Sequence, residues 1–307
     1  MTTLFSPIDF TIPSVHDGIT IDCRLHLPTP PRHSDPPRQP PVVRGAVMAH
    51  PYAPLGGSYN DRVVGLIVQE LLQQDFVTMT FNFRGAGDSQ GKTSWTGKPE
   101  LADYESAVGF LLSYLDGVEV ARAGPGSETG HVTTTLVLGG YSYGSLIASH
   151  LPSTTKIWKS FADGGAHGIH AQIRDRASKM ADTGHQQPMA GDYGRMEEVA
   201  QISTLYLLVS PILPPVSSLA TMFAALGPES IVDCPTLAVY GSADAFTSKR
   251  KLCRWAEDRA RRSGSGFVFR EIESAGHFWI EEGVDVELKE AVGGWMRSMM
   301  KSDVDAS

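Results

Sequence analysis

The sequence predicts an α/β fold in which helices cover both faces of a mostly parallel sheet, giving three layers. Strand-like apolar runs alternate with segments whose apolar residues recur at helical spacing, and this alternation is typical of parallel strands joined by crossover helices. Near the N-terminus two strand-like runs flank His16-Asp17-Gly18, a turn signal that predicts an antiparallel hairpin. With 307 residues and no internal repeat, the chain is expected to form one domain over 1–307.

The strand-forming runs follow one another along the chain and are mostly β-branched or apolar. They are expected over 10–15, 19–27, 43–49, 76–83, 136–139, 204–209, 236–240 and 267–272. A sheet of about eight strands follows from these runs.

The helical segments fall between these strands. They are expected over 61–74, 99–115, 216–226, 248–261 and 286–300. Asp61 is a suitable N-cap for the first helix, and Pro99 suits the first turn of the second.

Two segments interrupt the alternation. Residues 28–42 are rich in proline, which predicts an exposed loop, with a docking site for a proline-recognising partner as the less favoured alternative. Residues 151–202 are rich in glycine and polar residues, which predicts an inserted excursion that serves as a lid or a mobile segment, with one helix near 169–180.

The charge and hydropathy of the chain exclude some classes of function. The formal net charge is -8, which argues against nucleic-acid binding. The one basic cluster, between Lys249 and Arg262, is interrupted by Glu257 and Asp258 and is interpreted as a solvated helix face. No run approaches the roughly 20 apolar residues of a membrane span.

Cysteine usage and the N-terminus indicate the compartment. The three cysteines, Cys23, Cys234 and Cys253, are widely spaced, which favours buried thiols in a reducing environment over a disulfide framework. The first residues show neither a basic region nor a long apolar run of a secretory signal. A cytoplasmic location is therefore expected.

The strongest chemical signal is a serine between a strand and a helix. Residues 140–144 are Gly140-Tyr141-Ser142-Tyr143-Gly144, and they follow an apolar run and precede a helical one. A sharp strand-to-helix turn exposes such a hydroxyl, and the glycines let the two elements pass closely. Ser142 is therefore a candidate nucleophile, although so short a pattern also arises by chance.

A serine nucleophile needs a base, and the base needs an acid that orients it. In a parallel sheet both belong on loops after the carboxyl ends of later strands. Asp244 follows the predicted strand at 236–240, and His277 follows the strand at 267–272. This position and order make Ser142, Asp244 and His277 the expected catalytic residues.

Other histidines and acids fit these positions less well. His150 lies on the helix after the serine, and Asp233 precedes its strand, so Glu273 is the nearest alternative acid. His167 and His170 have the spacing of a metal pair but lack a third ligand at a convincing distance along the chain. We therefore expect no metal. Since neither GxGxxG nor GxxxxGK[ST] occurs, we expect no nucleotide cofactor either.

Acyl transfer also needs two backbone N–H groups that point at the developing oxyanion. One is expected from Tyr143, directly after the serine. The other belongs to the loop that begins at His50-Pro51, where Tyr52 or Ala53 must donate because proline has no N–H. Of these two, Tyr52 is favoured.

Several apolar side chains near these positions suit an acyl pocket, although each also suits the core. They are Tyr59, Phe246, Phe278, Trp279, Met222 and Phe223. Tyr59, Phe246 and Phe278 are the expected substrate-binding residues.

Together these features resemble the α/β-hydrolase superfamily, in particular small bacterial and fungal serine hydrolases with a reduced cap. The resemblance covers about residues 43–300 and rests on residues 140–144, 241–244, 276–277, 50–52 and the arginine-glycine turn in 82–89. It implies a three-layer α/β-hydrolase fold. Two departures stand out: many relatives have His-Gly where this chain has His50-Pro51, and the excursion precedes the sixth strand, whereas the family's cap usually follows it. Arg84 is interpreted as structural.

The resemblance implies acyl-enzyme chemistry on a small-molecule ester or thioester, with Ser142 as nucleophile, His277 as base and Asp244 as its partner. Three alternatives stay open. The first is hydrolysis. The second uses the same three residues for acyl transfer, cyclisation or a lyase step, and the third is a non-catalytic binding protein on the same scaffold, which would not require all three residues.

Overall fold

The structure is a computed structural model that describes residues 6–29, 42–123, 133–163, 165, 167–183, 202–221, 231, 233–262, 264 and 266–305. Most of the proline-rich loop predicted at 28–42 lies outside these residues, as do the last residues of the predicted excursion, 184–201. The expectations for these parts stay predictions.

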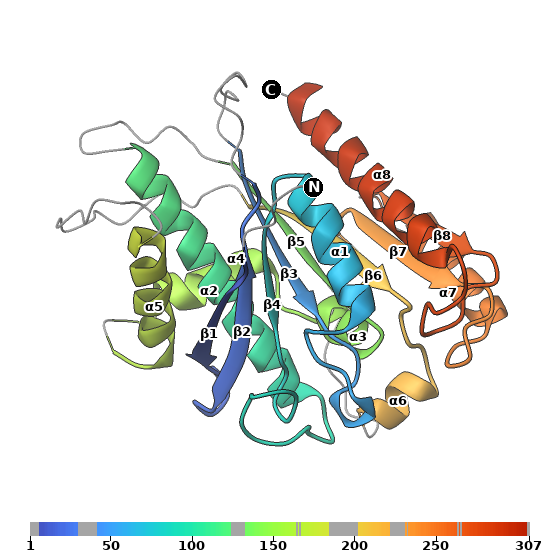
Figure 1. The fold of residues 1–307 in the computed structure, drawn as a ribbon, viewed down its shortest axis with the longest axis horizontal. Helices are drawn as coiled ribbons and strands as arrows, with labels where there is room; N and C mark the ends of the chain where they lie inside the picture. The colour runs from blue at the N-terminus through green and yellow to red at the C-terminus, as the bar shows by residue number, and fades with distance from the viewer. Residues whose placement is uncertain are drawn as a thin grey trace.

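Within the described residues, eight strands form one sheet in the order β1-β2-β4-β3-β5-β6-β7-β8 (Figure 1). Their bounds are Ile8–Pro13 (β1), Thr20–His26 (β2), Val42–Ala49 (β3), Val77–Phe81 (β4), Thr133–Tyr141 (β5), Ile202–Val209 (β6), Thr236–Gly241 (β7) and Phe267–Ile272 (β8). Neighbours from β4 to β8 are parallel, whereas β2 is antiparallel to both β1 and β4. The predicted mostly parallel sheet with an N-terminal hairpin is confirmed.

The helices lie in two layers, one on each face of the sheet (Figure 1). Their bounds are Arg62–Gln73 (α1), Lys98–Ala123 (α2), Tyr143–Ser149 (α3), Thr154–Ala162 (α4), Ile169–Thr183 (α5), Val216–Ala220 (α6), Lys249–Arg262 (α7) and Val284–Asp305 (α8), with a short 3-10 turn at Ala53–Leu55. Apolar side chains of α1 and α8 bury one face of the sheet, and those of α2, α3, α4, α5 and α7 bury the other. The three layers are those expected from the sequence. None of the described helices is long and apolar enough to cross a membrane.

The start of α1 is set by the predicted N-cap. The Asp61 carboxylate accepts hydrogen bonds from the backbone N–H groups of Val63 at 2.7 Å and Val64 at 3.4 Å. These two groups have no partner within the helix, so the cap satisfies them. Val63 and Val64 themselves are buried against the sheet.

The second helix is longer than the sequence pattern predicts. The apolar stripe ends near Leu115, but α2 continues to Ala123. The continuation lies against α5, where a Cβ placed on Gly117 would come within 3.0 Å of the Ala181 side chain. Packing between α2 and α5 therefore extends the helix beyond its own hydrophobic pattern.

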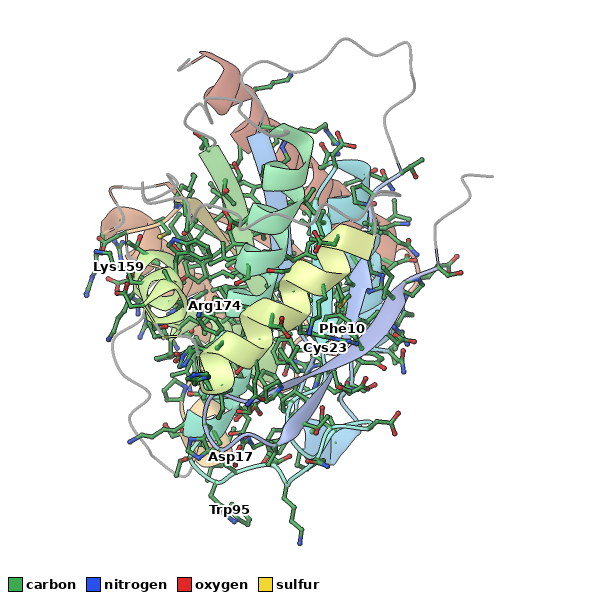
Figure 2. The ribbon with its side chains drawn as sticks, turned by 90° about the vertical axis from the view of Figure 1, so that its left-hand side faces the viewer. Phe10, Asp17, Cys23, Trp95, Lys159 and Arg174 are labelled. Atoms are coloured by element: carbon green, nitrogen blue, oxygen red, sulfur yellow. The ribbon has the colours of Figure 1, made fainter. Side chains whose placement is uncertain are left out.

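The described part of the excursion forms two helices, α4 and α5, and the helix expected near 169–180 is present. Both helices pack against α2, and α5 also contacts β1; Figure 2 shows α5 lying across this side of the molecule. The contact with α2 is close, because a Cβ on Gly109 would lie 2.1 Å from the Phe161 ring. The described part of the excursion thus extends the helical layer beside the hairpin.

Candidate active site

The site lies at the edge where the parallel strands β3 to β8 end, and its centre is the turn between β5 and α3. Ser142 occupies this turn with φ 57° and ψ -114°, a backbone conformation that non-glycine residues rarely adopt. Its N–H donates to the carbonyl of Val209 at 2.8 Å, which ties the turn to the end of β6. The strained turn holds the hydroxyl above the end of the strand.

The two glycines of the turn allow backbones to approach closely. A Cβ on Gly144 would lie 2.4 Å from the carbonyl oxygen of Ala49, and one on Gly140 would lie 2.4 Å from the carbonyl carbon of Gly144. Neither position has space for a side chain. Glycine at these two positions therefore lets α3 pass directly over the ends of β5 and β3.

The structure brings the three expected catalytic residues into one hydrogen-bonded chain. The Oγ of Ser142 lies 2.8 Å from Nε2 of His277, and Nδ1 of the same imidazole lies 2.7 Å from Oδ2 of Asp244. All three residues are at least nine-tenths buried. The carboxylate accepts the Nδ1 proton, which leaves the lone pair on Nε2 free to accept the serine hydroxyl.

Asp244 is oriented by its own loop. Its second oxygen, Oδ1, accepts hydrogen bonds from the backbone N–H groups of Phe246 at 2.8 Å and Thr247 at 2.9 Å. The two carboxylate oxygens thus have separate partners, one in the backbone and one in the imidazole. The carboxylate is fixed in the plane that the histidine needs.

The alternative residues have other partners. Glu273 is largely exposed and lies 3.7 Å from the ammonium of Lys249. The imidazole of His150 is hydrogen-bonded to the carbonyl of Leu146 and the hydroxyl of Ser149, within its own helix turn. These contacts leave His277 and Asp244 as the pair that reaches Ser142.

Two buried aromatic residues support the histidine loop. The hydroxyl of Tyr141 donates to the carbonyl of His277 at 2.6 Å. Trp279 is fully buried beside α8, and its indole N–H donates to the hydroxyl of Ser210 at 2.9 Å. Trp279, which the sequence offered as a pocket residue, is therefore a core residue that anchors the loop.

His50 fixes the start of the loop after β3. Its buried imidazole accepts the backbone N–H of Phe83 on Nε2 at 2.9 Å and donates from Nδ1 to the carbonyl of Pro51 at 2.5 Å. Burial lowers its pKa to about 4, so the ring is neutral. This neutral ring links the loop after β3 to the residues after β4.

Tyr52 and Tyr143, the expected oxyanion donors, lie next to each other. Their rings meet edge to face with centroids 5.1 Å apart. Among the described residues, neither of their backbone N–H groups donates a hydrogen bond. Burial raises the pKa of the Tyr143 phenol well above its usual range, so that side chain stays neutral.

Of the expected substrate-binding residues, the structure brings two to the histidine. The ring of Phe246 lies 4.2 Å from the imidazole of His277, and the ring of Phe278 lies 5.6 Å from it. Phe278 is 57% exposed, so it presents an apolar face to solvent beside the site.

Tyr59 is placed differently. The Arg24 guanidinium lies 4.3 Å from the centre of its ring. Burial and the nearby Asp22 carboxylate raise the pKa of Tyr59 to about 12. Arg24 belongs to β2, which is separated from the serine strand β5 by β4 and β3, so the ring of Tyr59 lies beside the hairpin. The other two candidates, Met222 and Phe223, lie outside the described residues.

Solved structures show the same architecture. An α/β serine hydrolase homologue from Coxiella burnetii aligns over 96% of this chain and 98% of its own, with 18% identity and a TM-score of 0.54. An α/β serine hydrolase without a lid from Xanthomonas campestris aligns over 96% and 95%, with 18% identity and a TM-score of 0.55. An esterase from Pyrococcus furiosus aligns over 96% and 93%, with 14% identity and a TM-score of 0.54.

The chain has the α/β-hydrolase fold. At these identities the likeness concerns the fold. No family model and no curated protein matches the sequence.

Within this α/β-hydrolase fold, Arg84 holds the hairpin to the core. Its guanidinium donates to the carboxylates of Asp103, at 2.8 Å, and of Asp17, at 3.0 Å, and to the hydroxyl of Ser14. Arg84 and Asp103 are both nearly inaccessible to solvent. These contacts agree with the structural interpretation of Arg84.

The described part of the chain holds no group of three or more His, Cys, Asp or Glu side chains that could bind a metal. Of the histidine pair at 167 and 170, His170 packs edge-on against the ring of Phe161 at 4.7 Å. Burial lowers its pKa. That contact gives His170 a packing role on α5.

Sequence reasoning missed three supporting contacts in this α/β-hydrolase fold. They are the bridge made by the His50 ring, the hydrogen bond from Tyr141 and the anchor made by Trp279. Tyr141 and Trp279 each lie within two residues of an expected catalytic residue, so a search for buried polar aromatics beside those residues would have found them.

Proposed function

We propose that the protein is a serine hydrolase that cleaves a small carboxylic ester or thioester through an acyl-enzyme. The hydrogen-bonded chain from Asp244 through His277 to Ser142 carries this proposal. A serine that is already hydrogen-bonded to an imidazole, itself oriented by a buried carboxylate, has the arrangement that nucleophilic catalysis requires. The esterases and serine hydrolases with the same fold agree with this chemistry.

In the first step Ser142 attacks the carbonyl carbon of the substrate. His277 takes the hydroxyl proton on Nε2 as the new bond forms, because that nitrogen already accepts the hydrogen bond from Oγ. Asp244 stabilises the resulting imidazolium through Nδ1 and keeps it in the correct tautomer. Its own orientation is preserved by the two backbone N–H groups on Oδ1.

The negative oxygen of the tetrahedral intermediate is stabilised by the backbone N–H groups of Tyr52 and Tyr143. Both groups lack a hydrogen-bond partner among the described residues, and both belong to loops that meet beside the serine. One such donor contributes about 3 kcal/mol to transition-state stabilisation in serine hydrolases. His50 sets the position of Tyr52, since its ring holds the preceding carbonyl.

Collapse of the intermediate expels the alcohol or thiol. His277 returns its proton to this leaving group and then accepts a proton from water, which attacks the acyl-enzyme. The acid leaves and Ser142 regains its proton. Each step moves one proton between the same nitrogen and a neighbouring oxygen or sulfur.

Hydrolysis is favoured over transfer to another acceptor because the solved structures with the same fold include serine hydrolases and esterases. Phe246 and Phe278 supply an apolar surface beside the imidazole, which suits an apolar acyl or leaving group.

The decisive experiment is covalent labelling with a fluorophosphonate probe. The parent protein is expected to be labelled once, and Ser142→Ala is expected to lose all labelling. Ser149→Ala, which removes another hydroxyl from the same helix, is the matched control and is expected to label normally. Labelling that persists in folded Ser142→Ala would contradict the proposal.

A second measurement separates hydrolysis from acyl transfer. Activated esters and thioesters of increasing chain length are supplied in water alone and with added alcohol or amine acceptors. Turnover in water at rates that do not depend on acceptor supports a hydrolase. Labelling without turnover until an acceptor is added would support the transferase alternative.

A further inference from the structure

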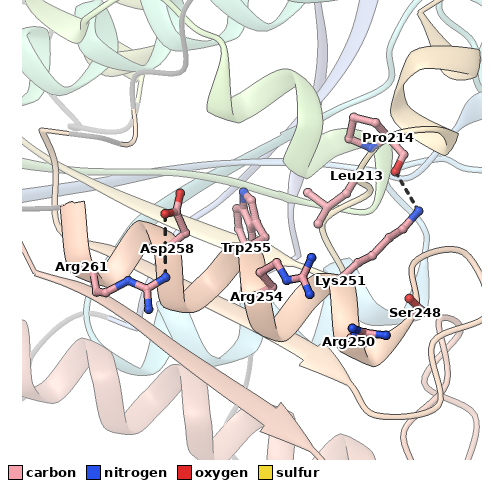
Figure 3. Close-up of a pocket in the computed structure, with 9 residues that line it drawn as sticks. All are labelled: Leu213, Pro214, Ser248, Arg250, Lys251, Arg254, Trp255, Asp258 and Arg261. Atoms are coloured by element: carbon pink, nitrogen blue, oxygen red, sulfur yellow. Dashed lines mark hydrogen bonds and ion pairs between the residues drawn. The ribbon is translucent and has the colours of Figure 1, made fainter.

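A cavity lies along α7, and none of Ser142, Asp244 and His277 lines it. It has a volume of about 790 Å³ and lies between the side chains of α7 and the segment at Leu213 and Pro214, which follows β6. Figure 3 shows Lys251 reaching from α7 to the carbonyl of Pro214, with Arg254 and Trp255 beside it on the same helix.

The cavity concentrates positive charge in an acidic protein. Arg250, Lys251, Arg254 and Arg261 line it with Asp258 as the one described acid, so four cations and one carboxylate leave a charge of +3. The chain as a whole has a formal net charge of -8. A local excess of cations against this background attracts an anion.

Two of these cations have no counter-ion among the described residues. Arg250 and Arg254 are one helical turn apart, and no described ion pair or hydrogen bond involves either guanidinium. Like charges at this spacing repel each other. By contrast, Lys249 on the same helix pairs with Glu271 at 2.6 Å, and Arg262 pairs with Asp258 at 3.1 Å.

Trp255 gives the cavity a flat apolar wall with one unused donor. Its ring packs edge-on against Phe267 at 5.5 Å, and its indole N–H is buried with no hydrogen-bond partner among the described residues. The side chain of Leu213 and the ring of Pro214 line the cavity too. Such a wall suits a planar or apolar organic group that also carries an acceptor.

We propose that this cavity binds a small organic phosphate, with the phosphate between Arg250 and Arg254 and the organic part against Trp255. A phosphate group carries a charge of about -1.5 to -2 and three acceptor oxygens, so it neutralises two guanidinium groups together better than a carboxylate does. The planar fork of arginine matches phosphate oxygens in pairs. This site goes beyond the proposed hydrolase function and does not depend on it.

The test is calorimetric titration of the full chain, carrying Ser142→Ala, with three probes. ADP is expected to bind, pyrophosphate to bind more weakly, and adenosine, which lacks phosphate, to give no measurable binding. The double variant R250Q/R254Q is expected to weaken ADP binding about tenfold or more. The matched control K249Q/R262Q removes two charges from the same helix outside the cavity and is expected to change the affinity less than about twofold.

Two further variants test the geometry. R250K/R254K keeps the charge and the helix but loses the forked donors, so weakened ADP binding is expected even if R250Q/R254Q does not fold. Trp255→Phe is expected to weaken ADP binding and leave pyrophosphate binding unchanged.

The proposal is overturned if the parent binds no ADP, or if the two charge-removing double variants weaken binding equally. It is overturned too if R250K/R254K binds ADP as the parent does, or if Trp255→Phe leaves ADP binding unchanged. Because Ser142 is absent throughout, these outcomes are independent of the labelling experiment.

Discussion

The neutral state of His50 predicts a loss of stability in mild acid. The imidazole is buried, and its Nε2 accepts the backbone N–H of Phe83 while its Nδ1 donates to Pro51. A proton added to Nε2 would face the Phe83 N–H, and one hydrogen bond would be lost. Burial accordingly lowers its pKa from 6.5 to about 4.

The sign and size of the effect follow from these two pKa values. Below pH 6.5 the unfolded chain takes up a proton at this histidine, whereas the folded protein does so only near pH 4, so acid favours unfolding. The full separation corresponds to about 3 kcal/mol, of which about 2 kcal/mol is lost between pH 7 and pH 4.5. The loss levels off as the pH falls well below 4, where the histidine is protonated in both states.

The measurement is the free energy of unfolding in urea at pH 7 and pH 4.5, for the parent and for His50→Gln. The variant is expected to be less stable at pH 7, because the glutamine side chain reproduces the two hydrogen bonds imperfectly. Between pH 7 and pH 4.5 the free energy of unfolding of His50→Gln is expected to fall by about 2 kcal/mol less than that of the parent.

His16→Gln, which removes an exposed histidine at the hairpin turn, is the control. Its free energy of unfolding is expected to fall between the two pH values by as much as that of the parent. Equal losses in the parent and in His50→Gln would refute the reasoning, since they would mean that His50 does not control the acid response.

Three further predictions concern Asp244, the turn at Ser142 and the contacts by which Arg84 holds the hairpin. Asp244→Asn is expected to keep the fold, checked by circular dichroism, and to lower kcat on an activated ester by about 10⁴-fold, because an amide does not stabilise a charged imidazole. Gly144→Ala places a Cβ 2.4 Å from a backbone carbonyl and is expected to lower the free energy of unfolding by about 2 kcal/mol or more. Gly65→Ala on α1 meets open space and is expected to raise it by about 0.5–1 kcal/mol. Urea unfolding measures both, and a Gly144→Ala variant more stable than Gly65→Ala would contradict this prediction. Arg84→Met leaves the fully buried carboxylate of Asp103 without its cation and is expected to cost about 3–5 kcal/mol, and a change below about 1 kcal/mol would rule out the anchor role.

The fold and the meeting of Asp244 and His277 with Ser142 were predictable, because both depend on sequence patterns within and directly after the strands. Alternating apolar runs determine which segments become strands, and the carboxyl ends of parallel strands meet at one edge. Asp244 and His277 each follow such an end, so their meeting with Ser142 was readable from order alone. The N-cap of α1 at Asp61 is equally local.

Contacts between loops were not predictable, since no periodicity describes them. The His50 ring reaches Phe83 only because β3 and β4 are neighbours whose loops fold toward each other. Tyr59 was expected in the pocket, but the antiparallel β2 brings Arg24 over its ring. The Trp279 side chain lies in the core, and its backbone has a φ of 56°, a conformation that the sequence does not signal.

The sequence pattern also did not predict helix ends that depend on packing against another helix. The end of α2 at Ala123 depends on α5, which comes from the excursion, and an amphipathic pattern within one helix carries no information about such a neighbour.

The loop that carries Asp244 has a consequence for how this protein can change. The carboxylate is held by the main-chain N–H groups of residues 246 and 247, whereas the ring of Phe246 is what lies against the imidazole. Any side chain at position 246 other than proline supplies the same N–H. In the proposed hydrolase, the surface offered to a substrate can therefore be altered at position 246 while Asp244 stays in place, so new substrate preferences can evolve without loss of the proposed chemistry.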